Sequence, residues 1–189
     1  MLRVLIIDSQ PDRLDMLVAA LKTIDYEVLT SMNSARSLHE EIFALHPDII
    51  IIAQDSPDRD TLEQICVANQ DCPHPIVMFT DDARPESIRA ATQAGVTSYV
   101  VDGMDTARIR PILDVAMSRF QAYRALHIEL EQTRLQLEER NIVDQAKAHL
   151  IRQTGASETE VYREMRRLAM DGGARIVDVA RQILQRANI

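Results

Sequence analysis

The sequence lacks the features that mark membrane-spanning and disulfide-stabilised proteins. It contains no run of about 18 apolar residues, and its first apolar stretch ends at Asp8, so we expect neither a membrane span nor a signal peptide. Only Cys66 and Cys72 are present in 189 residues, without a histidine cluster beside them. This excludes a disulfide framework and disfavours a zinc site. We therefore expect reduced thiols, no bound metal, and a cytoplasmic protein that does not contact a membrane.

The sequence patterns of common enzyme classes are also missing. No nucleophile stands beside a base in a recognisable motif, and no glycine-rich loop or metal-ligand cluster is present. We therefore expect a protein that is not an enzyme and needs no cofactor.

Positive charge is scarce, but it is unevenly distributed. The net charge is −8, yet residues 138–189 carry nine Lys and Arg against eight Asp and Glu. The preceding 137 residues carry 12 basic and 21 acidic side chains. A polyanionic partner such as nucleic acid is therefore expected to bind the C-terminal part.

The first 122 residues alternate short apolar runs with helix-length amphipathic stretches, such as residues 11–24 and 35–45. Runs such as 49–52 are apolar without interruption, which is typical of strands that are covered on both faces. The pattern predicts an α/β doubly wound domain with a five-stranded parallel sheet. The five predicted strands lie at 4–7, 26–29, 48–53, 75–80 and 97–101.

After Pro111, no strand pattern or strong helix breaker occurs until Gly155, which predicts one long helix of about 40 residues. Two apolar rows recur along it with a period of seven residues, as in coiled coils. The rows are Tyr123, Leu130 and Leu137, and Ile128, Leu135 and Ile142. We expect a homodimer formed through this helix; the alternative is a helix that packs only on its own chain.

Two shorter helices are predicted to follow. Ser157 and Glu160 form a capping-box pattern that begins a helix ending at Met170, and a third helix runs from Arg175 to Ala187. The three helices make a small all-α domain. Its predicted core consists of Ile151, Val161, Met165, Leu168, Ala169, Ile176, Val179, Ala180 and Ile183.

Residues 1–122 resemble the receiver domains of response regulators, which have a flavodoxin-like fold. The resemblance is clearest in PDIIIIAQDSP at 47–57. It implies acidic residues for Mg²⁺ after the first strand, an aspartate that accepts phosphate at the end of the third, a Ser or Thr after the fourth and a lysine after the fifth. Ala53 stands at the acceptor position, and its methyl group has no oxygen to attack a phosphoryl group.

The other positions of the site are mixed. Asp8 and Thr80 match the receiver pattern, whereas Ser9 replaces a frequent second acid and Asp102 replaces the lysine. An anion in place of that cation would repel a phosphoryl group. Together with Ala53, these residues form a degenerate phosphorylation site, and Mg²⁺ binding is not expected.

Two alternatives remain open for this site. Asp55, Asp58 or Asp60 could accept phosphate in place of Ala53, although the stretch SPDRD has the composition of a turn whose carboxylates cap backbone or face water. Ala53 could also be an engineered change in an otherwise receiver-like frame.

Residues 123–189 are expected to comprise a connecting coiled-coil helix and a module that resembles the ANTAR family of RNA-binding antitermination domains. The stretch RNIVDQAKA carries the family signature, except that Ala148 replaces a glycine. Further matches are SETEVYREMRRLAMDGG, which begins at Ser157, and RIVDVARQIL. The resemblance implies that dimers bind paired stem-loops in leader transcripts and prevent a terminator hairpin from forming.

Five basic side chains are the candidate RNA ligands. Arg140 and Lys147 are two helical turns apart and project from nearly one face. The others form a compact cluster on the next helix, which suits phosphates and loop bases. The cluster consists of Arg163, Arg166 and Arg167. The competing interpretation is a solvated face balanced by Glu160 and Glu164.

The stretches SPDRDTLEQ and SYVVDG resemble the NasT-type regulators of nitrate assimilation. The resemblance implies a nitrate- or nitrite-sensing inhibitory protein as the partner, in place of phosphorylation. Three alternatives are an amide-responsive regulator of the same architecture, a protein-interaction module without RNA activity and a DNA-binding response regulator. The last would need a helix-turn-helix pattern, which the tail lacks.

Overall fold

The computed structural model describes residues 1–32, 38–102 and 104–187. The chain divides into two compact units, Met1–Arg124 and Ala125–Ile189. Among the described residues, no helix is both long enough and apolar enough to cross a bilayer.

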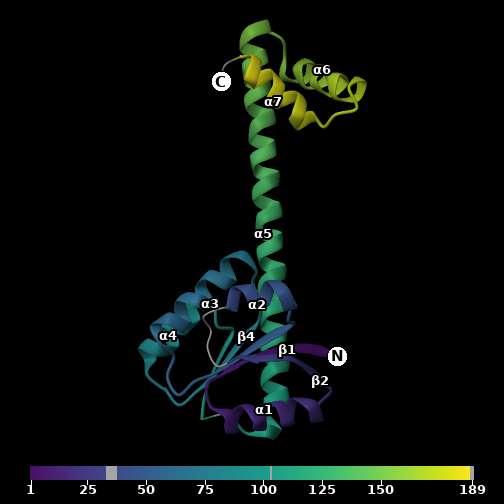
Figure 1. The fold of residues 1–189 in the computed structure, drawn as a ribbon. Coiled ribbons are helices and arrows are strands. Elements are labelled where there is room, and N and C mark those ends of the chain that lie inside the picture. Colours follow the sequence, from purple (N-terminus) through teal and green to yellow (C-terminus); the bar gives the residue numbers. More distant parts are fainter. Residues whose placement is uncertain (33–37, 103, 188–189) are drawn as a thin grey trace. The chain divides into compact units, whose positions relative to one another are not determined.

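The first unit is built on a five-stranded parallel sheet (Figure 1). The strand order is β2-β1-β3-β4-β5. The chain adds β2 on one side of β1 and then adds β3, β4 and β5 on the other side, with all strands parallel. This confirms the predicted α/β doubly wound fold, because each long apolar run forms a strand that is covered on both faces. The strands are β1 (Leu2–Asp8), β2 (Tyr26–Met32), β3 (Ile49–Ala53), β4 (Ile76–Thr80) and β5 (Ser98–Val101).

Helices cover both faces of this sheet. Side chains of α1 and the start of α5 pack against one face, and those of α2, α3 and α4 pack against the other. The predicted start of α2 at residues 35–37 lies outside the described residues. The helices are α1 (Pro11–Thr23), α2 (Leu38–Leu45), α3 (Arg59–Asp71), α4 (Pro85–Ala94) and α5 (Thr106–Thr154).

Because all five strands are parallel, their carboxyl ends meet at one edge of the sheet. Asp8 ends β1, Ala53 ends β3 and Thr80 ends β4. Asp8 and Ala53 are directly paired across the sheet. The strand register therefore brings the predicted phosphorylation-site positions together at this edge.

Helix α5 begins earlier than the sequence pattern indicates, since Pro111 lies inside it. The Asp105 carboxylate accepts a hydrogen bond from the backbone N–H of Ala107 at 3.0 Å, which caps the first turn. Pro111 is the sixth residue of α5, beyond the first turn, so the helix runs through it without the backbone hydrogen bond that its N–H would have donated. The other end is as predicted: α5 stops at Thr154, before Gly155 with φ +70°.

The second unit packs α6 (Glu158–Asp171) and α7 (Ile176–Arg186) against the end of α5. The capping box is present: Ser157 and Glu160 exchange both of its hydrogen bonds. The prediction of Leu168 as a core residue is wrong, because its side chain is 45% exposed. Only a narrow face of α6 is covered by the other two helices, and Leu168 lies at its margin. The buried core consists of Ala146, Val161, Met165, Ala180 and Leu184.

Candidate functional site

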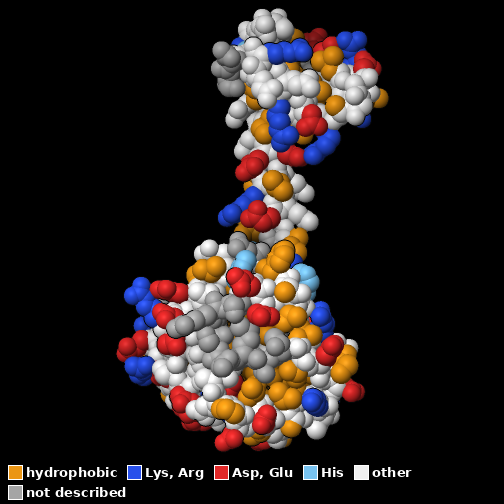
Figure 2. Space-filling model, in the orientation of Figure 1, with side chains coloured by type: hydrophobic (Ala, Val, Ile, Leu, Met, Phe, Trp, Pro, Cys, Tyr) orange, Lys and Arg blue, Asp and Glu red, His pale blue; other side chains and the backbone are white. Residues whose placement is uncertain are grey.

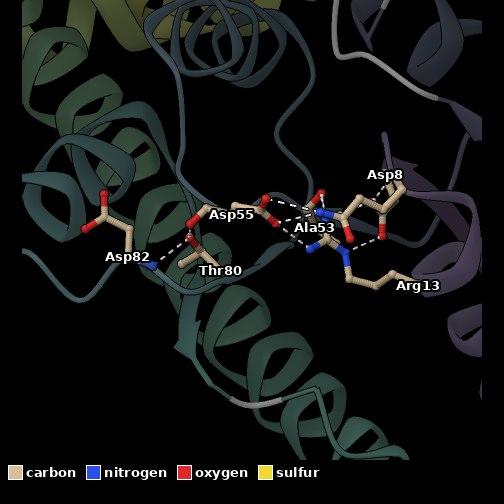
Figure 3. A network of polar contacts seen from close by, with 7 residues as sticks. Asp8, Arg13, Ala53, Asp55, Thr80 and Asp82 are labelled. Carbon is tan, nitrogen blue, oxygen red and sulfur yellow. Dashed lines mark hydrogen bonds and ion pairs between the residues drawn. The ribbon is translucent and has the colours of Figure 1, made fainter.

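The carboxyl edge of the sheet, where the predicted phosphorylation-site positions meet, holds a network centred on Arg13 (Figure 3). Ala53 is completely buried there and offers only its backbone carbonyl oxygen. Arg13, from the first turns of α1, donates to both Asp8 carboxylate oxygens at 2.7 and 2.8 Å. It also donates to Asp55 at 2.8 Å and to the Ala53 carbonyl oxygen at 3.1 Å. One guanidinium group therefore joins the ends of β1 and β3.

Electrostatics reinforce this network. The pKa of Arg13 lies above its ordinary value, mainly because Arg13 donates a hydrogen bond to Asp8. Burial lowers this pKa, whereas the hydrogen bond to Asp55 raises it further. The Asp8 side chain is fully buried, while Arg13 is 18% exposed. Asp8 also accepts from the backbone N–H of Gln10 at 2.8 Å, and the Gln10 side chain donates to Asp55. The cation therefore remains charged and fixed.

This arrangement does not fit a Mg²⁺ ion. The ion would need the carboxylates of Asp8 and Asp55 as anchors, but the Arg13 guanidinium bridges them. Sequence reasoning missed Arg13 and Gln10. A signal was present, because Arg13 lies five residues after Asp8, in a helix that begins at the sheet edge.

Thr80 and its neighbours form a second network beside the first (Figure 3). The Thr80 hydroxyl donates to the backbone carbonyl oxygen of Asp55 at 2.9 Å and accepts from the backbone N–H of Asp82 at 3.1 Å. The Asp82 carboxylate accepts from Arg84 at 2.7 Å and from the hydroxyls of Ser56 and Ser87. The hydrogen bond from Arg84 is the main cause that holds the pKa of Asp82 below its ordinary value.

This second network ties the loop after β3 to the loop after β4. Tyr99 completes it by donating its hydroxyl to the backbone carbonyl oxygen of Asp82 at 2.8 Å. The Thr80 hydroxyl is thus committed to backbone groups of the two loops.

A cavity of about 390 Å³ lies at this edge and is lined by Asp102, Asp81 and Asp105 together with Arg13. A phosphoryl group entering it would meet three carboxylates, and the guanidinium group of Arg13 is already bound to two further carboxylates. Ser9 is exposed at the end of β1, outside the lining of this cavity. The receiver positions named from sequence therefore meet at one edge, where the acceptor position, Ala53, has no side-chain oxygen.

Two of the three loop acids considered as substitute acceptors have other partners. Asp55 is bound to Arg13 and Gln10, and Asp58 caps α3 by accepting from the backbone N–H of Thr61 at 2.6 Å. Asp60 is exposed in the first turn of α3.

In the second unit, an open groove of about 410 Å³ runs along α5, α6 and the start of α7. It brings together Arg140 and Lys147, as the spacing of seven predicts. It also contains Tyr162 and Arg175, which the prediction of site residues omitted. The sequence analysis placed Tyr162 in the stretch that begins at Ser157 and Arg175 at the start of the third helix, without a ligand role for either.

The two predicted ligands in this groove differ in exposure. Arg140 is 81% exposed, and its nearest carboxylate partner, Asp144, lies 3.9 Å away. Lys147 is only 16% exposed and contacts Asp144 at 2.7 Å and Glu158 at 2.8 Å. Lys147 donates to both carboxylates, and these hydrogen bonds, the one to Asp144 first, raise the pKa of Lys147. Lys147 therefore ties α5 to the start of α6 as well as lining the groove.

The three arginines of α6 are all exposed. Arg167 is bound to Glu164 at 2.6 Å, which raises the pKa of its guanidinium group. Among the described residues, no ion pair is recorded for Arg163 or Arg166. In the upper part of Figure 2, basic and acidic side chains alternate over the visible face of this unit, without a continuous basic patch.

The chain is similar to known proteins in both units. Residues 131–184 match the family model of the ANTAR domain. Transcriptional regulatory protein PdtaR of Mycobacterium tuberculosis is 28% identical over 185 residues, which cover 97% of this chain and 89% of that protein.

Solved structures match the first unit. A signal receiver domain of a modulated diguanylate cyclase from Desulfovibrio desulfuricans has a TM-score of 0.57 at 18% identity, covering 65% of this chain and 98% of that one. Chemotaxis protein CheY4 of Vibrio cholerae has a TM-score of 0.55 at 21% identity, covering 61% and 98%. At these identities the likeness shows the fold alone. The chain therefore joins a receiver-like domain with a CheY-like fold to a C-terminal ANTAR domain.

Proposed function

We propose that this protein is an RNA-binding regulator of transcription antitermination. The observation that carries the proposal is the ANTAR match at residues 131–184, within a chain similar over nearly its whole length to a transcriptional regulatory protein. Dimers bind paired stem-loops in leader transcripts and thereby keep the terminator hairpin from forming. The domains that act are the receiver-like residues 1–122 and the RNA-binding residues 123–189.

The basic side chains contribute unequally to this binding. Arg140 and Arg166 are exposed and reach RNA without dismantling a close ion pair. Arg163 lies one helical turn from Arg166 on α6 and extends the same surface. Lys147 and Arg167 already hold carboxylates at 2.8 Å or less, so RNA must compete with Asp144, Glu158 and Glu164 for them.

An RNA-binding titration tests the proposal. A leader RNA with two stem-loops should bind the full chain, and Arg140→Ala and Arg166→Ala should each weaken binding. The matched control is Arg134→Ala, since Arg134 is 64% exposed on α5 and pairs within that helix. No RNA binding by the unaltered chain would favour the second candidate, a protein-interaction module without RNA activity.

Dimerisation is proposed to use the middle of α5. Five apolar side chains there are at least 45% exposed, an unusual density for a helix surrounded by water. They are Leu126, Ile128, Leu130, Leu135 and Leu137. Helical spacing places Leu126, Leu130 and Leu137 on one side of α5 and Ile128 and Leu135 on the other, so a second copy of the helix would cover one of these two rows. Sedimentation should show a dimer that Leu130→Glu or Leu135→Glu dissociates and the exposed control Gln132→Glu does not.

The input is proposed to be a nitrate- or nitrite-sensing inhibitory protein that binds the regulator until ligand releases it. Support comes from Ala53, which has no side-chain oxygen at the acceptor position, and from the arginine-centred network, in which Arg13 already binds Asp8 and Asp55. An amide-responsive input is the alternative. Pull-downs from cells grown with and without nitrate should recover a partner whose association depends on nitrate; equal recovery would contradict the nitrate assignment.

Independence from phosphorylation has its own test. Incubation with an acyl phosphate donor should leave the protein unlabelled. Ala53→Asp alone should also label poorly, because Asp102 still repels phosphate and Arg13 still occupies the metal position. Stable labelling of the unaltered chain would show that another acid, such as Asp55, accepts phosphate.

A further inference from the structure

The groove of the ANTAR unit has the chemistry of a site for one uncharged aromatic group. Its polar wall comes from α5, with Glu139, Arg140 and Asp144, and Arg175 faces them from the start of α7. Apolar side chains of Val143, Ile176 and Val177 line the remainder. Tyr162 of α6 lies at the groove with 45% of its surface exposed. The volume of about 410 Å³ is in the range of small-ligand sites.

Two of the three cations that line this groove already hold a carboxylate in close contact. Arg175 is hydrogen-bonded to Glu139, and Lys147 is held by Asp144 and Glu158. Arg140 is 81% exposed and keeps a distance of 3.9 Å from Asp144, so it stays available to a phosphate. A phosphate would have to displace carboxylates to bind the other two cations, which makes the interior of the groove less suited to the RNA backbone than the exposed arginines of α6.

A nucleobase is uncharged and does not need to displace these carboxylates. Exposed aromatic rings are the usual platforms on which unpaired bases stack. Carboxylates accept hydrogen bonds from exocyclic amino groups, and arginine donates to ring nitrogens and carbonyl oxygens. All three kinds of group converge here, in Tyr162, Glu139 and Arg175.

We propose that this groove binds one unpaired RNA base carrying an exocyclic amino group, stacked on Tyr162 and read by Glu139, Asp144 and Arg175. This inference rests on the proposed RNA-binding function and adds a division of labour to it. The exposed arginines of α6 hold phosphates, whereas the groove selects a base in the loop.

Salt dependence distinguishes the two roles. Each phosphate contact contributes about one unit to the slope of log affinity against log salt, whereas a stacked base contributes almost nothing. Affinities of the full chain for the two-stem-loop RNA should be measured at several salt concentrations. Tyr162→Ala should weaken binding by about 5- to 150-fold with the slope unchanged. Arg166→Ala should lower the slope by about one unit.

Two matched variants control for folding. Tyr162→Phe keeps the ring and should retain most of the affinity. Leu168→Ala truncates a side chain of the same 45% exposure on the same helix but outside the groove, and it should bind RNA normally. Thermal unfolding of each variant shows whether the domain is intact.

An RNA-side measurement serves if Tyr162→Ala does not fold. Removing one loop base at a time, with an abasic nucleotide, should identify a position whose loss weakens binding of the unaltered chain by about 5- to 150-fold. If Tyr162→Ala does fold, combining it with that abasic RNA should weaken binding no further than either change alone, because both remove the same contact.

The outcomes separate this inference from the function on which it rests. If the unaltered chain does not bind RNA, the proposed function fails. If the unaltered chain binds but every abasic position is tolerated, or Tyr162→Ala binds equally well, RNA binding stands and the base site is overturned. A drop in salt slope for Tyr162→Ala would also overturn it.

Discussion

Both units contain arginine–carboxylate clusters, but they differ in how far water reaches them. At the sheet edge, Asp8 is fully buried and Arg13 is 18% exposed, so the pair is enclosed by the fold. In the ANTAR unit, Arg140 and Arg175 are 81% and 66% exposed. Buried pairs are costly to break, because one charge is left without water or partner, whereas exposed pairs contribute little. The first cluster therefore stabilises the fold, whereas the exposed arginines of the second can exchange their carboxylate partners for a ligand.

The hydrophobic cores differ in the same direction. The first unit has a packed layer on each face of its sheet. The ANTAR unit has one small core at the end of a helix whose middle is exposed. Small cores leave little stability in reserve. The ANTAR unit should therefore be the more sensitive of the two to a single core substitution.

The largest expected effect tests that sensitivity. Met165→Ala removes a completely buried side chain from the small core and should cost about 2–5 kcal/mol of unfolding free energy. Calorimetry should show the transition of the ANTAR unit shifted or lost, while the transition of the first unit persists. The control Met170→Ala, on the same helix but 74% exposed, should change stability by less than about 0.5 kcal/mol.

The next effect concerns the buried pair. Arg13→Ala leaves the Asp8 charge buried and should cost about 2–3 kcal/mol, somewhat below the value for a fully buried pair because Arg13 keeps some exposure. Urea unfolding of the first unit measures it. Arg59→Ala, which removes an exposed partner of Glu63, should cost no more than about 0.5 kcal/mol.

A second substitution sharpens this result. Adding Asp8→Asn to Arg13→Ala removes the unpaired charge and should restore part of the lost stability. If Arg13→Ala were as mild as Arg59→Ala, the distinction between an architectural and an exchangeable cluster would be wrong.

A smaller effect separates the two predicted RNA ligands of α5. Lys147→Ala should lower both RNA affinity and stability, the latter by about 1 kcal/mol, because Lys147 joins Asp144 to Glu158. Arg140→Ala should lower affinity alone, with a stability change below about 0.5 kcal/mol. Paired unfolding and binding curves decide the matter. Equal stability losses in both variants would remove the structural role assigned to Lys147.

The smallest effect is a dependence of stability on pH. The pKa of Asp82 is lower in the folded chain than its unfolded value of about 3.9, mainly because Arg84 donates to its carboxylate. A carboxyl group whose pKa is lower in the folded chain stabilises the fold at every pH above its pKa in the unfolded chain. This stabilisation is lost as the pH falls from the unfolded pKa through the folded pKa, because the carboxyl group becomes protonated. Urea midpoints at pH 7 and pH 3 should therefore differ less for Asp82→Asn than for the unaltered chain. Asp15→Asn, an exposed change on α1, should leave the difference as it was.

Much of the fold could be predicted because the patterns are local. Uninterrupted apolar runs identified the five strands, and the capping box of Ser157 and Glu160 identified the start of α6. Leu168 was misassigned because helical spacing shows that a face is apolar without showing how wide the covering surface is. The start of α5 was missed because Pro111 was taken as the boundary, whereas the helix begins five residues earlier and runs through it.

The sequence by itself determined the absence of an acceptor oxygen at Ala53 and the alternation that gives a parallel sheet, since both depend on residue type and order. Only the tertiary structure decided which charges meet. Arg13 and Asp55 are 42 residues apart, and Glu139 and Arg175 are 36 apart, so no spacing rule connects them. The packing of distant segments decides how far water reaches a cation: Arg13 is enclosed, whereas Arg140 is exposed. This difference in exposure separates a structural ion pair from a group that can bind a ligand.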